Sequence, residues 1–182
     1  CPIMLWVIVA IHILFMSLNF LGYKKTKNTL FLLSGLIVLG LFYDALILAF
    51  GGVVNDGALL KGLSRARFVS HGALIPLIFL ICSYSLDFKG VWKTVAFALT
   101  AILIVLGIAE GFAVELQAQN VADICRYTSG ENTPAWATTV SNVLSYGTVV
   151  PLMIIGIIAW VKQKTPALFL SGFLMFAFSA LG

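Results

Sequence analysis

Long apolar runs alternate with short polar or charged segments along the whole 182-residue chain. A transmembrane helix needs about 20 consecutive, mostly apolar residues. The runs that approach or exceed this length cover residues 2–22, 29–54, 67–86, 94–114, 135–161 and 166–182. The last run is still apolar at Gly182, so we expect it to be truncated and the complete protein to have as many as seven spans. The pattern predicts an all-α, polytopic transmembrane helix bundle that forms a single domain.

Composition points to lipid as the surrounding solvent. Hydrophobic residues make up 61% of the chain and charged residues 10%, whereas a soluble domain is roughly 45–50% apolar and about 25% charged. A soluble chain of this length buries only about 70% of its surface, which leaves too little interior for so many apolar side chains. The net charge of +4 is spread over short connections instead of one basic stripe. We therefore expect membrane lipid, and not nucleic acid, as a partner.

Lysine-bearing turns predict the orientation in the membrane, since short loops rich in Lys and Arg stay on the cytoplasmic side. The turns after the first, third and fifth runs contain Lys24, Lys25 and Lys27, then Lys89 and Lys93, then Lys162 and Lys164. We expect these turns to be cytoplasmic. The N-terminus and the connections 55–66 and 115–136 should then lie outside. The second of these connections is long, and we expect a solvated loop with a short interfacial helix.

Two segments suggest an internal repeat. Residues 67–77 read RFVSHGALIPL and residues 142–152 read NVLSYGTVVPL, so Ser, Gly, Pro and Leu recur at the same positions. This match predicts a duplicated helical hairpin, an arrangement known from transporters. The alternative is a chance match between apolar sequences. Either way, Pro76 and Pro151 should each kink a span, because proline cannot donate the helical hydrogen bond.

Ionisable side chains inside the spans mark the candidate site. A charge at bilayer depth costs roughly 2.5–3.5 kcal/mol on insertion scales, so each one needs a partner, a water-filled cavity or a function. Asp44, His71 and Glu110 fall within predicted spans at the same outer level. Glu110 also lies between Gly107 and Gly111, a GxxxG pattern that is typical of close helix packing. We expect the glycines to contact a neighbouring helix while the carboxyl faces the other polar groups.

Helical spacing extends this set. Arg67 and His71 are four residues apart and share a helix face, and the same holds for Asn142 and Tyr146. We therefore predict a ligand-binding or proton-coupling cluster formed by Asp44, Arg67, His71, Glu110, Asn142 and Tyr146. Arg67 would keep an acid ionised, and His71 could change its protonation near neutral pH. The alternative is that Arg67 pairs with one acid and extends towards the headgroups, while His71 is a buried hydrogen-bonding residue.

Cofactor and metal signals are weak. His12 and His71 could supply two axial haem ligands, but a histidine in a span more often hydrogen-bonds to a neighbouring helix, so we predict no cofactor. The sequence contains no metal-ligand spacing and no nucleotide-binding or nucleophile motif. Cys82 should pack as a small apolar residue. Cys1 and Cys125, both expected outside, could form a disulfide.

Three function hypotheses follow. The first, which we favour, is a multi-pass membrane protein that binds or moves a small solute, lipid or proton through an outer-facing polar cluster. The second is a non-catalytic subunit that packs against protein partners in a larger membrane complex. The third is an intramembrane enzyme that uses His71 and a carboxylate as acid and base. The absence of a recognisable catalytic motif favours the two non-enzymatic hypotheses.

Overall fold

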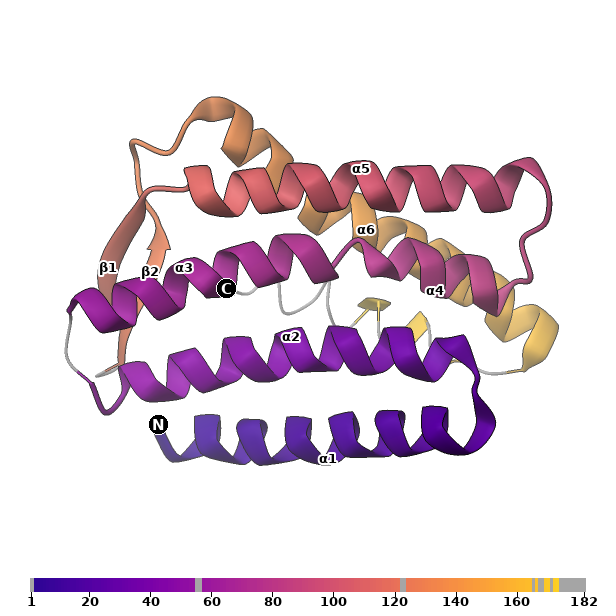
Figure 1. The fold of residues 1–182 in the computed structure, drawn as a ribbon, viewed down its shortest axis with the longest axis horizontal. Helices are drawn as coiled ribbons and strands as arrows, with labels where there is room; N and C mark the ends of the chain where they lie inside the picture. Colours follow the sequence, from indigo (N-terminus) through magenta and orange to yellow (C-terminus); the bar gives the residue numbers. More distant parts are fainter. Residues whose placement is uncertain are drawn as a thin grey trace.

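A computed structural model of the chain describes residues 2–54, 57–121, 124–164, 166, 169–170 and 172–173. The described part is a bundle of helices with one small β-hairpin at its end (Figure 1). In chain order the elements are α1 (Pro2–Thr26), α2 (Thr29–Gly51), α3 (Ala58–Leu74), α4 (Leu77–Ser85), α5 (Val91–Ala113), β1 (Leu116–Val121), β2 (Ile124–Ser129) and α6 (Ala135–Gln163).

Five helical segments are long and apolar enough to cross a membrane: α1, α2, α5, α6, and α3 with α4 taken together. The prediction of a multi-pass helical bundle is confirmed at this level. The sixth predicted span, residues 166–182, falls mostly outside the described residues. Most apolar side chains of α1 are exposed, as expected of a helix whose outer face contacts lipid.

The third span begins earlier than predicted, at Ala58 instead of 67. The segment before Arg67 reads as a Gly-rich polar connection, but it is helical and one of its faces is buried. Leu60 and Ser64 are buried, whereas Lys61 is exposed. This amphipathic turn lets α3 reach beyond the apolar run and pack under the hairpin.

Pro76 breaks the third span into α3 and α4. Because proline has no N–H, the carbonyl of Gly72 loses its helical donor at this point. The buried hydroxyl of Thr100 in α5 reaches the Pro76 carbonyl oxygen at 3.4 Å and donates to the Ala96 carbonyl at 2.7 Å. Pro151, by contrast, lies inside the uninterrupted helix α6. The two proline segments of the suggested repeat therefore differ in local structure.

Glycines bring α3 and α5 into direct backbone contact. A Cβ atom added to Gly107 would lie 2.8 Å from the Cα of Gly72, and one added to Gly111 would lie 2.7 Å from the Cα of Val69. The GxxxG pattern therefore acts as a packing surface, as its spacing predicts. Glu110 lies between these two glycines in the sequence and lines a cavity that Gly72 also lines.

The connection 115–136 contains a β-hairpin, so the expectation of an interfacial helix there is wrong. Antiparallel pairing runs from Leu116 opposite Ser129 to Val121 opposite Ile124. Burial alternates along β2, where Cys125 and Tyr127 are buried, and this period of two residues is the signature of a strand. The buried face forms one apolar cluster with the ends of three helices, made of Ile47, Leu60, Val114, Leu116, Cys125 and Tyr127.

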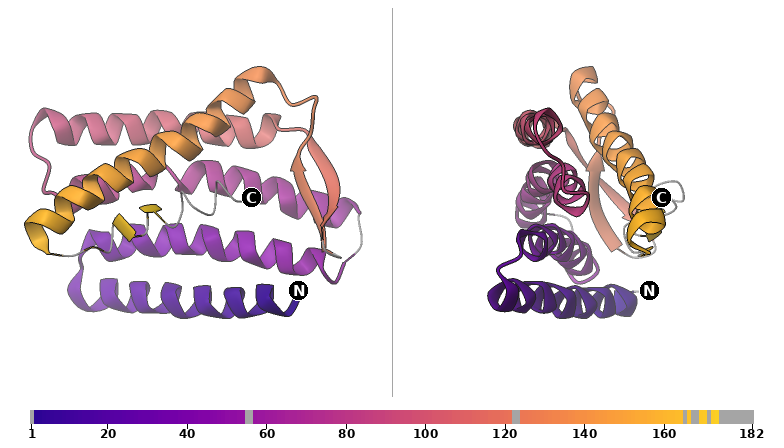
Figure 2. Two further views of the ribbon diagram at one scale, coloured as in Figure 1. Left: turned by 180° about the vertical axis from the view of Figure 1, so that it is seen from behind. Right: turned by 90° about the vertical axis from the view of Figure 1, so that its right-hand side faces the viewer.

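The bundle has two chemically different ends. The turns that carry lysines, at 24–27, 89–93 and 162–164, lie at one end, and the hairpin covers the other (Figures 1 and 2). Figure 2 also shows α6 crossing the remaining helices obliquely. This crossing places one stretch of α6 over the half of the bundle that is nearest to the hairpin.

Candidate functional site

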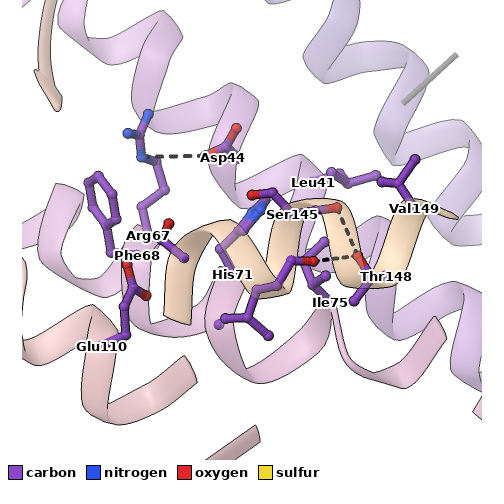
Figure 3. A pocket seen from close by; sticks show the side chains of 13 residues that line it. Leu41, Asp44, Arg67, Phe68, His71, Ile75, Glu110, Ser145, Thr148 and Val149 are labelled. Carbon is purple, nitrogen blue, oxygen red and sulfur yellow. Dashed lines mark hydrogen bonds and ion pairs between the residues drawn. The ribbon is translucent and has the colours of Figure 1, made fainter. Parts of the chain in front are cut away.

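A pocket of about 350 Å³ lies between α2, α3, α5 and α6 (Figure 3). Its size is within the range of small-molecule sites, roughly 300–1,000 Å³. The polar lining residues are Asp44, Arg67, His71, Glu110, Ser141, Ser145 and Thr148. The remaining lining residues are Leu41, Phe68, Gly72, Ile75, Leu144 and Val149. A mixed polar and apolar lining within an apolar bundle is typical of a binding cavity.

Four of the six predicted site residues line this pocket: Asp44, Arg67, His71 and Glu110. Asn142 and Tyr146 do share a helix face, but that face points away from the pocket, and Tyr146 is 55% exposed. The lining residues of α6 belong to the neighbouring face. The hydroxyl residues there follow i, i+4, i+7 spacing, a helical signal that could have been found in the sequence: Ser141, Ser145 and Thr148.

An ion pair between α2 and α3 forms one wall of the pocket. Arg67 Nε lies 3.3 Å from Asp44 Oδ1, and the two side chains are 14% and 33% exposed. Arg67 Nη2 also donates to the backbone carbonyl of Tyr127 in β2, at 3.0 Å. The guanidinium lies over the ring of Phe68, with its Cζ 5.1 Å from the ring centroid. Arg67 thus connects two helices and the hairpin at the edge of the cavity.

His71 follows Arg67 by one helical turn and faces the same space (Figure 3). Although it lies within a predicted membrane span, its side chain is accessible from the pocket. Among the described residues, no hydrogen bond joins His71 to Asp44 or Glu110. An acid–base pair of the kind needed for general catalysis is therefore not formed in this structure.

Glu110 contributes the second carboxyl group of the pocket. It is only 4% exposed, and the Ser141 side chain of α6 is a hydrogen-bonding partner. Within the described part of the chain, no Lys or Arg side chain forms an ion pair with it. Glu110 therefore differs from Asp44, which has the Arg67 guanidinium beside it.

The nearby Arg65 is occupied elsewhere. Its Nη1 donates to the carbonyls of Gly111 at 2.9 Å and Phe112 at 3.2 Å, and also to that of Val114. These are carbonyls at the end of α5, which lack helical donors and carry the negative end of the helix dipole. Arg65 stabilises this helix end and is not a lining residue of the pocket.

The two histidines proposed for haem do not meet at one site. His12 lies on α1, where its Nδ1 is 2.7 Å from the carbonyl oxygen of Ile8. Helix α2 lies between α1 and α3 (Figures 1 and 2), and His12 does not line the pocket. The described residues contain no group of three or more His, Cys, Asp or Glu side chains that could hold a metal ion. Cys82 is buried in α4, and Cys1 lies outside the described residues.

No protein-family model, curated protein or solved structure matches this chain.

Proposed function

We propose that this chain is a membrane protein that binds a small solute in the pocket between α2, α3, α5 and α6. One observation carries the proposal: an accessible cavity inside an apolar bundle is lined by an ion pair, a histidine and a second carboxyl group. Burying such groups within membrane spans is costly, and packing alone could be achieved with apolar residues. A binding or transport role gives these groups a purpose.

A ligand screen with a variant that fills the pocket tests this proposal. Ser145 lines the cavity and its side chain is accessible, so Ser145→Phe should place a ring in the cavity without disturbing the buried contacts of α6. We expect at least one class among cationic, anionic, zwitterionic and neutral small solutes to raise the unfolding temperature of the purified protein by several degrees. Ligand that binds only the folded state stabilises it by about 2.7 kcal/mol at a hundredfold excess over Kd.

Asn142→Phe provides the matched control, because Asn142 is exposed on the same helix and does not line the pocket. The stabilisation should disappear in Ser145→Phe and persist in Asn142→Phe. Equal stabilisation in both variants, or none by any solute class in the wild-type protein, would reject the pocket as a solute site.

We further propose the membrane orientation in which the lysine turns are cytoplasmic and the hairpin is outside, with a sixth span over 166–182. The three lysine-bearing turns lie at the end away from the hairpin, whereas Lys61 is the one lysine among the described residues at the hairpin end, and this asymmetry supports the orientation through the positive-inside rule. The duplicated hairpin also stays a proposal, supported by the repeated Ser, Gly, Pro and Leu positions.

Cysteine labelling on intact cells tests the orientation. In a background without native cysteines, Asn120→Cys on the hairpin should react with a membrane-impermeant maleimide, and Lys25→Cys should react only after the cells are opened. Both positions are exposed, so burial within the protein would not keep the maleimide from either cysteine. The opposite labelling pattern would invert the proposed topology.

A further inference from the structure

We infer that the ligand of this pocket is a small primary ammonium compound, with Glu110 as the counter-ion of its charged nitrogen. The inference rests on the proposed function and names the class of solute. It starts from the charges of the four ionisable lining residues. Asp44 and Arg67 are 3.3 Å apart and neutralise each other. A neutral His71 and an ionised Glu110 would together leave one negative charge in the pocket for the ligand to balance.

The position of Glu110 favours a cation. Its side chain is 4% exposed and lies near the C-terminal end of α5, three residues before Ala113. That end of a helix carries a partial negative charge, which attracts positive groups. The cation nearest to that helix end, Arg65, is already donating to backbone carbonyls there. A positively charged ligand would give the buried carboxylate the partner that no described Lys or Arg provides.

Hydroxyl groups on α6 complete a site for an N–H donor. Ser141, a hydrogen-bonding partner of Glu110, and Ser145, one helical turn further along α6, line the pocket and can accept hydrogen bonds. Thr148 also lines the pocket, but it is fully buried and its hydroxyl donates to the Leu144 carbonyl. The Glu110 carboxylate and the two serine hydroxyls provide acceptors for a primary ammonium, which has three N–H donors.

The apolar wall indicates the rest of the ligand. Leu41, Ile75 and Val149 line the same cavity and would contact a short alkyl group. An anionic ligand fits poorly, because it would meet Glu110 and would have to compete with Asp44 and the Tyr127 carbonyl for the Arg67 guanidinium. A small organic amine with a short apolar chain therefore matches both the charge and the lining of the cavity.

The test uses three probes with the same four-carbon skeleton and different charge: n-butylammonium, butyramide and butyrate. Each radiolabelled probe is dialysed to equilibrium at pH 7 against the purified chain in phosphatidylcholine nanodiscs, and binding to empty nanodiscs is subtracted. We expect saturable binding of one n-butylammonium per chain, with butyramide at least about tenfold weaker and no binding of butyrate, as expected for charge-assisted hydrogen bonds.

Glu110→Gln should weaken n-butylammonium binding at least about tenfold, whereas Glu131→Gln, at an exposed position after β2, should leave it unchanged. If Glu110→Gln does not fold, the comparison of the three probes on the wild-type chain still decides. Tighter binding of butyrate or butyramide would overturn the ammonium inference and leave the solute-binding proposal intact. Binding of none of the three would also overturn it, and the Ser145→Phe screen then decides the fate of the proposed function.

Discussion

Gly107→Ala should lower the free energy of unfolding by about 3 kcal/mol, which is the upper part of the usual range for overpacking. The added methyl group would lie 2.8 Å from the Cα of Gly72. Real Cβ atoms do not approach backbone so closely, and a backbone atom cannot move aside as a flexible side chain can. Helices α3 and α5 would have to separate, and packing between helices is a main source of stability within a membrane.

Gly62→Ala is the matched control for this substitution. Gly62 likewise lies inside a helix, α3, but an added Cβ there would meet no atom within 4 Å. Because alanine favours the helix over glycine by about 1 kcal/mol, this variant should be neutral or slightly more stable. Unfolding by SDS in mixed micelles, followed by circular dichroism, measures both. Similar stability for the two variants would show that the contact between Gly72 and Gly107 does not hold the helices together.

Breaking the ion pair at the pocket should be the next most damaging change. Arg67→Ala removes the Asp44 contact, the hydrogen bond to the Tyr127 carbonyl and the packing on Phe68. Removing one member of a buried pair costs about 3–5 kcal/mol. Since the Asp44 side chain keeps 33% exposure and can be partly hydrated, we expect a loss of about 2–3 kcal/mol.

A double-mutant cycle with Asp44→Ala separates the energy of the ion pair from that of the other interactions lost in Arg67→Ala. The coupling energy should be about 1–2 kcal/mol, because the double variant leaves no unpaired charge. The pair of Asp87 and Lys89 serves as the control, since its side chains are 81% and 83% exposed at a similar separation of 3.1 Å. Its coupling should stay below about 1 kcal/mol. Equal coupling energies for the two pairs would show that partial burial in the pocket does not strengthen the ion pair between Asp44 and Arg67.

The sequence predicted those parts of the fold that follow from long apolar runs. A helix in lipid satisfies its own backbone hydrogen bonds, so an apolar run of sufficient length is enough to locate it. The hairpin was missed because the segment 115–136 is polar on average, and its alternation extends over only six residues of β2. The start of α3 was missed for a related reason, since Lys61 and Gly62 hide the buried Leu60 and Ser64 in any average over the segment.

The candidate site could be predicted where charge made residues conspicuous. Asp44, Arg67, His71 and Glu110 stand out in apolar spans, and the structure places all four around one pocket. On α6 the spacing of four residues identified a shared face but not its direction. The rotation of a helix about its own axis depends on its packing against neighbours, and it placed Ser141, Ser145 and Thr148 inward instead of Asn142 and Tyr146.

The charged groups and the hydroxyl groups of the pocket lie on different walls. The charged groups lie on α2, α3 and α5, and the last two are locked by glycine contacts that tolerate almost no added atom. The hydroxyl groups come from α6, where Ser145 has space around it. Substitutions on α6 could therefore change the size or polarity of the accepted solute while the helix contacts and the charge arrangement persist. Directed evolution towards new ligands should begin at positions 141 and 145.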